Sequence, residues 1–220
     1  NMTKTSPIAI ERKPRIGIIG TGRMAFALGR AFLEAGHFVA FGSRRPEKKK
    51  EFHTSVGIDS KVYGVQAAID AGEIVVIALP YKEVAGAVRE FADSLRNKIV
   101  IDISNPFGYQ PNNGYSGAEV TASIIGVGAR VFAAFKTNFS DTICEPIDSS
   151  GNTREVHYAG DDDEAMQIVE ELIRGIGFKP INCGGLAQAV ALDHMVPLMI
   201  RIDTASFSSS RKSSIRFTGP

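Results

Sequence analysis

Cysteine, net charge and long apolar runs are all scarce in this sequence, and each scarcity excludes a class of protein. Two cysteines, Cys144 and Cys183, occur in 220 residues, too few for a disulfide framework and too far apart for a paired metal ligand. Basic and acidic residues nearly cancel, with 25 Lys and Arg against 24 Asp and Glu. Overall charge therefore gives no reason to expect a nucleic acid or an anionic membrane as partner. No apolar run is long enough to span a bilayer.

The N-terminus also lacks an apolar segment of signal-peptide length. We expect residues 1–14 to be loose. The low cysteine content fits a reducing compartment, and we expect a cytoplasmic protein. The length suits one large domain, so we interpret residues 1–220 as a single domain with a C-terminal tail at 187–220.

Candidate metal ligands are equally sparse. The histidines lie in different segments without ligand spacing: His37, His53, His157 and His194. The acidic run at 161–164 begins an amphipathic segment, where N-capping and the helix dipole already favour carboxylates. We therefore expect no bound metal. The sequence offers no Ser-His-Asp set either, so no catalytic residue is assigned.

Short apolar runs alternate with helix-like segments along the chain. The expected strands lie at 15–20, 38–43, 61–65, 73–80, 98–106, 130–135, 155–160 and 179–185. The expected helices lie at 23–36, 46–57, 65–72, 82–95, 118–126, 161–177 and 187–202. Near-continuous apolar strands, each followed by a helix, predict an α/β fold with a doubly wound, mostly parallel sheet covered on both faces.

The segment GTGRMA, residues 20–25, follows the first strand and begins a helix. It fits the G-x-G-x-x-G/A fingerprint of dinucleotide-binding folds of the Rossmann type, in which Gly20 permits the tight turn and Gly22 lets the backbone approach a pyrophosphate. The helix N-terminus then offers N–H groups to that anion. Besides Gly20, this loop supplies Gly22 and Arg23 as predicted cofactor contacts. For Arg23, pairing with the pyrophosphate and a solvent-facing position are both open.

The second strand ends in a basic cluster instead of the carboxylate that an NAD site places there to accept the ribose 2′-OH. Ser43 can hydrogen-bond a phosphate, Arg44 can bind it with charge and a planar fork, and Lys48 can approach the same place. The cluster, which includes Arg45, predicts a site for the 2′-phosphate of NADP. We interpret Lys49 and Lys50 as a solvated face.

Ligands in open α/β sheets bind beyond the carboxyl ends of the strands. There, Leu79 and Pro80 can pack on the nicotinamide ribose, Tyr81 can stack or hydrogen-bond, and Asn105, followed by Pro106, can bind the carboxamide. A structural role at the end of a strand, where the loop begins, explains Pro80 and Pro106 equally well.

In combination, the motifs IIGTGRMAF, FGSRRP, VVIALP, VIDISNP and YAGDDDEA resemble those of the deazaflavin (coenzyme F420)-dependent NADP oxidoreductases. They are also similar to the cytosolic NADPH domain of the six-transmembrane metalloreductases. The resemblance covers roughly residues 15–202 and implies hydride transfer between NADPH and a flavin-like ring. It implies that these residues bind the cofactor: Thr21, Gly22, Arg23, Met24, Ser43, Arg44, Lys48, Leu79, Val84, Asn105 and Ala134.

The chain departs from the family on the acceptor side. It has Tyr81, Lys82 and Glu83 where the family usually has an aromatic residue followed by Glu-His, and Lys136 where the family has Asn or His. Lys136 either attracts an anionic acceptor or is a surface lysine at the start of a loop.

We predict an NADP-dependent oxidoreductase acting on a flavin-like or deazaflavin acceptor. Two alternatives remain: a reductase of a small C=N or C=O substrate, and a non-enzymatic NADPH-binding sensor. The apolar helix at 187–202, interrupted by Pro197, predicts a homodimer; the alternative is a tail that folds back over its own sheet.

Overall fold

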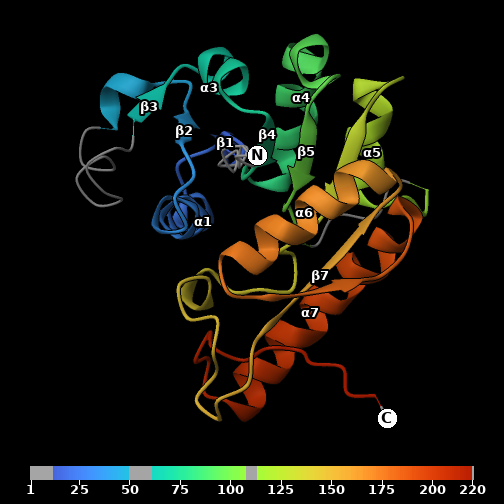
Figure 1. The fold of residues 1–220 in the computed structure, drawn as a ribbon. Helices are drawn as coiled ribbons and strands as arrows, with labels where there is room; N and C mark the ends of the chain where they lie inside the picture. Colours follow the sequence, from blue (N-terminus) through green and yellow to red (C-terminus); the bar gives the residue numbers. More distant parts are fainter. Residues whose placement is uncertain (1–11, 50–60, 108–112, 220) are drawn as a thin grey trace, which may run out of the picture.

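A computed structural model describes residues 12–49, 61–107 and 113–219. An eight-stranded sheet runs through it in the order β3-β2-β1-β4-β5-β6-β7-β8 (Figure 1). The strands are β1 (Ile16–Ile19), β2 (Val39–Gly42), β3 (Lys61–Tyr63), β4 (Ile74–Ile77), β5 (Ile99–Asp102), β6 (Arg130–Ala133), β7 (Glu155–Gly160) and β8 (Lys179–Asn182).

Neighbouring strands pair in parallel with one exception. The pair β6–β7 is antiparallel, whereas β8 runs parallel to β7. The order reverses beside β1, which pairs with β2 on one side and β4 on the other. This reversal is the point at which doubly wound sheets open a crevice for ligands.

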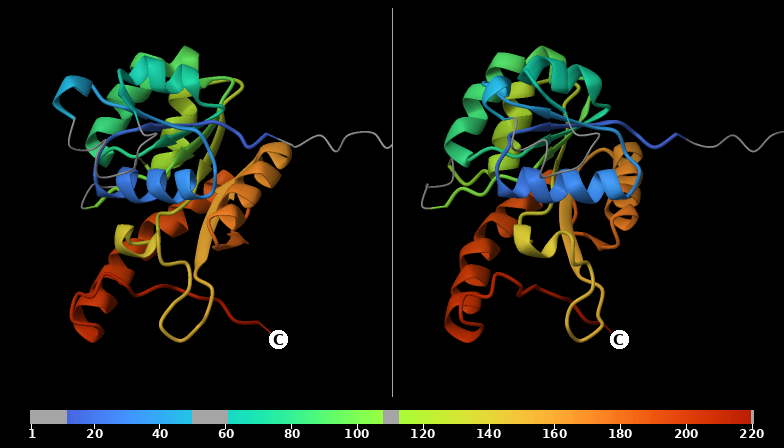
Figure 2. Two further views of the ribbon diagram at one scale, coloured as in Figure 1. Left: turned by 60° about the vertical axis from the view of Figure 1, so that its left-hand side comes forward. Right: turned by 90° about the vertical axis from the view of Figure 1, so that its left-hand side faces the viewer.

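Helices cover both faces of the sheet (Figure 2). Apolar side chains of α1 (Arg23–Glu34) and α6 (Asp163–Gly175) pack into one core. The opposite core holds side chains of α3 (Val65–Ala71), α4 (Tyr81–Leu95), α5 (Gly117–Ile125) and the start of α7 (Ala189–Ser206). The predicted fold class is confirmed: the apolar strands are buried because helices lie on both sides.

Two helices have sequence features that fix where they begin. Ser116 forms a capping box with Glu119 at the start of α5, and Asp162 caps α6 by accepting from Ala165 N at 2.8 Å. The acidic run at 161–164 thus holds a helix cap, as the sequence predicted.

The basic segment after β2 differs from the prediction. Of the helix predicted at 46–57, the structure describes residues 46–49, and there it has a 3₁₀ turn, η1 (Pro46–Lys48). Residues 50–60 of that prediction, including Lys50 and His53, lie outside the described residues.

Residues 12–14 contact the body of the protein rather than lying loose. Arg12 pairs with Glu73 at 2.9 Å, and the carbonyl of Pro14 lies 2.9 Å from His37 Nδ1. The remainder of the predicted loose segment, residues 1–11, lies outside the described residues.

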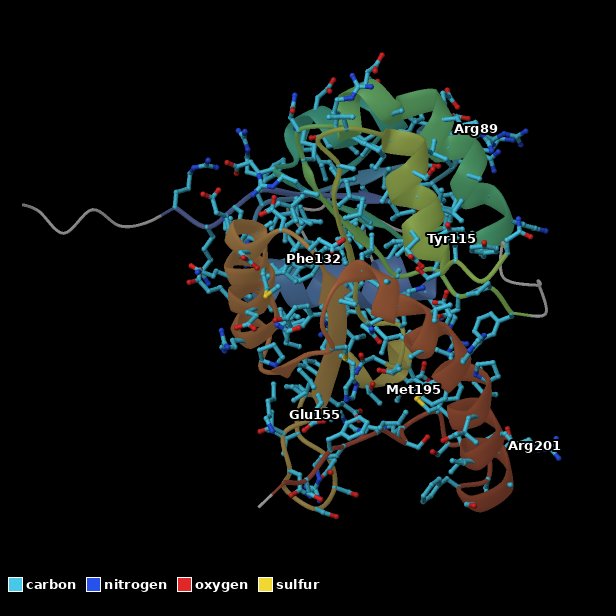
Figure 3. The ribbon with its side chains drawn as sticks, turned by 90° about the vertical axis from the view of Figure 1, so that its right-hand side faces the viewer. Arg89, Tyr115, Phe132, Glu155, Met195 and Arg201 are labelled. Carbon is cyan, nitrogen blue, oxygen red and sulfur yellow. The ribbon has the colours of Figure 1, made fainter. Side chains whose placement is uncertain are left out.

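The C-terminal tail has two parts. Helix α7 continues through Pro197, and it buries Leu192, Val196 and Met199. Figure 3 shows Met195 on the inward side of this helix and Arg201 pointing away from the protein. The segment after α7 folds back onto β7, where Phe217 N donates to Glu155 Oε2 at 3.0 Å. Part of the tail therefore covers its own sheet.

Candidate cofactor site

Two adjoining hollows lie at the carboxyl ends of the central strands. The first, of about 930 Å³, lies between the phosphate loop, the end of β2 and the first three turns of α4. The second, of about 500 Å³, lies between the start of α1, the end of β4 and residues 103–107. Both are lined by Gly22, Ala78, Leu79, Pro80 and Lys82, so together they form one groove across the switch point.

The phosphate loop is shaped by its glycines. Gly20 has a φ of +121°, and a Cβ there would lie 2.2 Å from the carbonyl oxygen of Ala78, so no other residue fits without distortion. Gly22 caps α1 without a side-chain hydrogen bond, and a Cβ there would meet nothing within 4 Å. The N-terminus of α1 therefore faces the groove with open space in front of it, which suits a pyrophosphate.

The basic cluster lies at one end of this groove. Ser43, Arg44 and Arg45 all line the larger hollow, and Ser43 Oγ accepts from Arg45 N at 3.1 Å. Arg44 is 80% exposed, and its Nη2 donates to Glu83 Oε2 at 2.8 Å. A carboxylate from α4 thus lies beside the end of β2, a contact that the sequence did not predict.

Two neighbouring lysines differ from their predicted positions. Lys49, interpreted as solvated, lines the larger hollow with Ser43 and Arg44. Lys48, predicted to contact the 2′-phosphate, lines a third hollow of about 850 Å³ beside α1. The reason is the 3₁₀ turn, whose three-residue period directs successive side chains differently from the predicted helix.

Arg23 also faces the third hollow. Its Nη2 lies 3.1 Å from Asp141 Oδ1, on the loop that follows β6. The side chain is 71% exposed, and Arg23 also lines the smaller hollow of the groove, so pairing with a pyrophosphate stays a prediction.

The other end of the groove has the features expected for a nicotinamide. Four residues that the sequence assigned to the nicotinamide end line it: Leu79, Pro80, Tyr81 and Asn105. Met24, assigned to the phosphate loop, lines it as well, together with Ile103, Ser104 and Phe107, which were not assigned. Asn105 Nδ2 donates to the carbonyl of Lys136 at 3.3 Å, whereas no described residue donates a hydrogen bond to the buried Oδ1. A buried acceptor without a donor is costly, and a carboxamide N–H would satisfy it.

Three predicted contacts lie behind the groove or beside it. Val84 is 3% exposed and Ala134 is fully buried, and both belong to the hydrophobic cores. Pro106 is absent from the lining of both hollows.

Lys136 is neither an exposed anion-binding group nor a surface lysine. Its side chain is fully buried, and Nζ lies 2.7 Å from Asp193 Oδ1 of α7 and also donates to the carbonyl of Ser104. Asp193 Oδ2 in turn accepts from Gly117 N at 3.0 Å. Both sequence-based interpretations of Lys136 are therefore wrong: the residue is an internal connection between β6, α5 and α7.

Within residues 12–49, 61–107 and 113–219, no three His, Cys, Asp or Glu side chains gather as metal ligands. The helices in this part of the chain are too short or too polar to cross a membrane.

The reversed strand order, the glycine turn and the open helix N-terminus define the class of protein: a dinucleotide-binding fold of the Rossmann type. Residues 15–106 match the family model described as "NADP oxidoreductase coenzyme F420-dependent".

Relatives over most of the chain agree with this match. The chain is 27% identical to the F420-dependent NADP reductase of Methanocaldococcus jannaschii, over 93% of this chain and 98% of that protein. It is 30% identical to the rat metalloreductase STEAP3 over 85% of this chain, but spans only 37% of that protein's length. A crystal structure of a candidate F420-dependent NADP reductase from Arthrobacter sp. FB24 has the same fold, with a TM-score of 0.84 at 22% identity, covering 94% of this chain and all of that one.

The resemblance to both groups is thus confirmed.

Proposed function

We propose that this protein binds NADP(H) along the groove and transfers a hydride between the nicotinamide and a flavin-like or deazaflavin acceptor. The observation that carries the proposal is the continuity of the groove. One end holds Ser43 and Arg44, which can bind a phosphate, and the other end holds Asn105 Oδ1, to which no described residue donates. One extended ligand with a phosphate at one end and a carboxamide at the other would satisfy both.

The residues of the groove have distinct tasks in this proposal. The N–H groups at the start of α1 would bind the pyrophosphate, while Leu79 and Pro80 would pack against the nicotinamide ribose. Asn105 would fix the carboxamide and so decide which ring face is presented. When bound, the nicotinamide supplies the hydride, and the protein contributes mainly orientation and exclusion of water.

A flavin-like acceptor is proposed from the names of the relatives, since two groups of them are F420-dependent reductases and metalloreductases. A screen of NADPH oxidation with FMN, FAD, a deazaflavin, ferric chelates and a cyclic imine separates the candidates. Turnover with the imine alone would favour the C=N reductase, and binding without turnover on any acceptor would favour the sensor.

The cofactor preference is tested separately from turnover. We expect NADPH to bind at least about tenfold more tightly than NADH, and Arg44→Ala to weaken NADPH about ten- to a hundredfold with little effect on NADH. The chain contains no tryptophan, so NADPH fluorescence can be followed without energy transfer from that residue; calorimetry is the independent measure. Equal losses for both cofactors would assign Arg44 to the fold instead.

A homodimer and a cytoplasmic location complete the proposal. The two free cysteines fit a reducing compartment. The dimer is supported by apolar side chains that α7 and its end leave exposed, namely Leu198, Ile202 and Phe207, and we propose that this surface packs near the partner's acceptor site.

The dimer is tested by light scattering of Leu198→Glu/Ile202→Glu, with Arg89→Glu, exposed on α4 (Figure 3), as control. We expect the double variant to be monomeric and the control to be dimeric. A monomeric wild type, or a double variant that remains dimeric, would contradict the proposed interface.

A further inference from the structure

An acidic side chain faces Arg44 in the part of the groove assigned to the 2′-phosphate. Glu83 lies in the first turn of α4, and its Oε2 is 2.8 Å from Arg44 Nη2. Glu83 is about one-third exposed, whereas Arg44 is four-fifths exposed. The carboxylate is therefore the more fixed partner, and it holds the guanidinium at the edge of the groove.

The adenosine ends of NAD and NADP interact with Glu83 in opposite ways. A ribose 2′-hydroxyl donates a hydrogen bond to a carboxylate, which is why NAD sites place one in this region. A 2′-phosphate carries negative charge, so it is repelled by the same carboxylate and competes with it for the Arg44 guanidinium. Removing the charge of Glu83 should thus strengthen binding of the adenosine end of NADP and weaken binding of the adenosine end of NAD.

We propose that Glu83 is a specificity-determining residue that narrows the preference for NADP over NAD by competing with the 2′-phosphate for Arg44. The inference rests on the proposed cofactor groove and deepens it. The preference is then set by the Arg44–Glu83 pair and not by the basic cluster alone.

Glu83 also has an ordinary structural role, because a carboxylate in the first turn of a helix interacts favourably with its dipole. That role does not distinguish a phosphorylated ribose from an unphosphorylated one. A change in the ratio of the two affinities therefore separates specificity from structure.

The matched control is Glu90, which lies on the same helix and lines the same hollow. Arg44 and Glu90 form no ion pair within the described residues, where Arg44 is paired with Glu83. Glu90→Gln therefore removes an equal charge from the groove without releasing the guanidinium.

The experiment uses fragments of the adenosine end, so that it does not depend on the nicotinamide or the acceptor. Binding of 2′,5′-ADP and of 5′-AMP is measured by calorimetry for the wild type, Glu83→Gln and Glu90→Gln, with thermal melts to establish folding. We expect Glu83→Gln to bind 2′,5′-ADP about three- to fivefold more tightly, the upper part of the range for losing a partly exposed ion pair. Binding of 5′-AMP should be unchanged or up to about threefold weaker.

For Glu90→Gln, the ratio of the two affinities should stay within about twofold of the wild type. The role of Glu83 would be overturned by either of two results for Glu83→Gln. The ratio of the two affinities could stay within about twofold of the wild type, or it could shift no more than it does in Glu90→Gln. Failure of the proposed function has a different signature: neither fragment would bind to folded wild-type protein. That outcome would remove the cofactor site and this inference with it.

Discussion

Gly20 and Gly22 lie two residues apart in the phosphate loop but have different surroundings. Gly20 is confined by a left-handed φ of +121° and by the backbone of Ala78, whereas Gly22, with a φ of −86°, faces open space. The first glycine is therefore required by the fold, and the second by whatever occupies the groove.

Alanine at each position should separate these two requirements. Gly20→Ala should lower the free energy of unfolding by about 1–3 kcal/mol, because it adds a backbone clash and a strained φ. Gly22→Ala should change stability by less than about 1 kcal/mol. It should nonetheless weaken NADPH by at least about tenfold, since the methyl group lies where the pyrophosphate must approach. Urea unfolding and calorimetry measure the two effects, and normal NADPH binding by Gly22→Ala would contradict the assigned loop.

At the scale of elements, the buried pair of Lys136 and Asp193 connects three parts of the fold. Shortly after β6, Phe135 has a left-handed φ of 57°. The next residue is Lys136, whose side chain lies inside the protein. Asp193 lies on α7 and also accepts from the first turn of α5. The Lys136 carbonyl and Nζ contact Asn105 and Ser104 at the nicotinamide end of the groove.

Removing one partner of this pair should be costly. Lys136→Met leaves the Asp193 carboxylate buried without its counter-ion, so we expect a loss of about 3–5 kcal/mol in the free energy of unfolding. The double variant Lys136→Met/Asp193→Leu removes both charges and should recover most of that loss. Urea unfolding of the two single variants and the double variant gives the coupling energy, and simple additivity would show that the pair does not act as a unit.

The Lys136–Asp193 pair makes deletion of α7 unsuitable as a test of the proposed dimer. Deleting the chain after Gly185 would remove Asp193 and expose the apolar surface that Leu192 and Val196 cover. A truncated protein would then be destabilised whether or not α7 forms a dimer interface. Substitution of the exposed residues of α7 is therefore the appropriate test of the dimer.

At the scale of the whole molecule, two buried histidines couple stability to pH. Burial lowers the pKa of His37 and of His157; for His157 the opposing effect of Glu155, 3.3 Å away, is smaller. His157 also contacts Thr137 through Nδ1 and Phe217 of the folded-back tail. Protonation in the folded state is thus disfavoured relative to the unfolded chain.

The sign of the pH dependence follows from the lowered pKa. Below the unfolded histidine pKa of about 6.5 the unfolded state binds more protons. Stability should therefore be complete above that pH and fall as the pH drops below about 6.5, by up to about 1.4 kcal/mol per pH unit for each histidine.

Urea unfolding at several pH values measures this dependence, with His157→Gln expected to show a shallower slope than the wild type. The exposed His194→Gln serves as control. Equal slopes for the wild type and His157→Gln would show that this histidine does not contribute.

The sequence alone determined the order of the strands and helices, the glycine turn at residues 20–25 and the basic end of β2. These features depend on short-range patterns, because apolar runs, caps and turn residues act within a few positions of one another. The expected residues at the groove, from Ser43 and Arg44 to Asn105, were found for the same reason: the ends of parallel strands meet at one edge.

Only the tertiary structure decided which charges meet. Arg44 contacts Glu83 across 39 positions, and Lys136 contacts Asp193 across 57. It also decided that Lys49 rather than Lys48 lines the larger hollow, and that Val84 and Ala134 face the cores. No local pattern specifies such contacts, because the free energy of a charge depends on burial and on partners that the folded chain brings from distant segments.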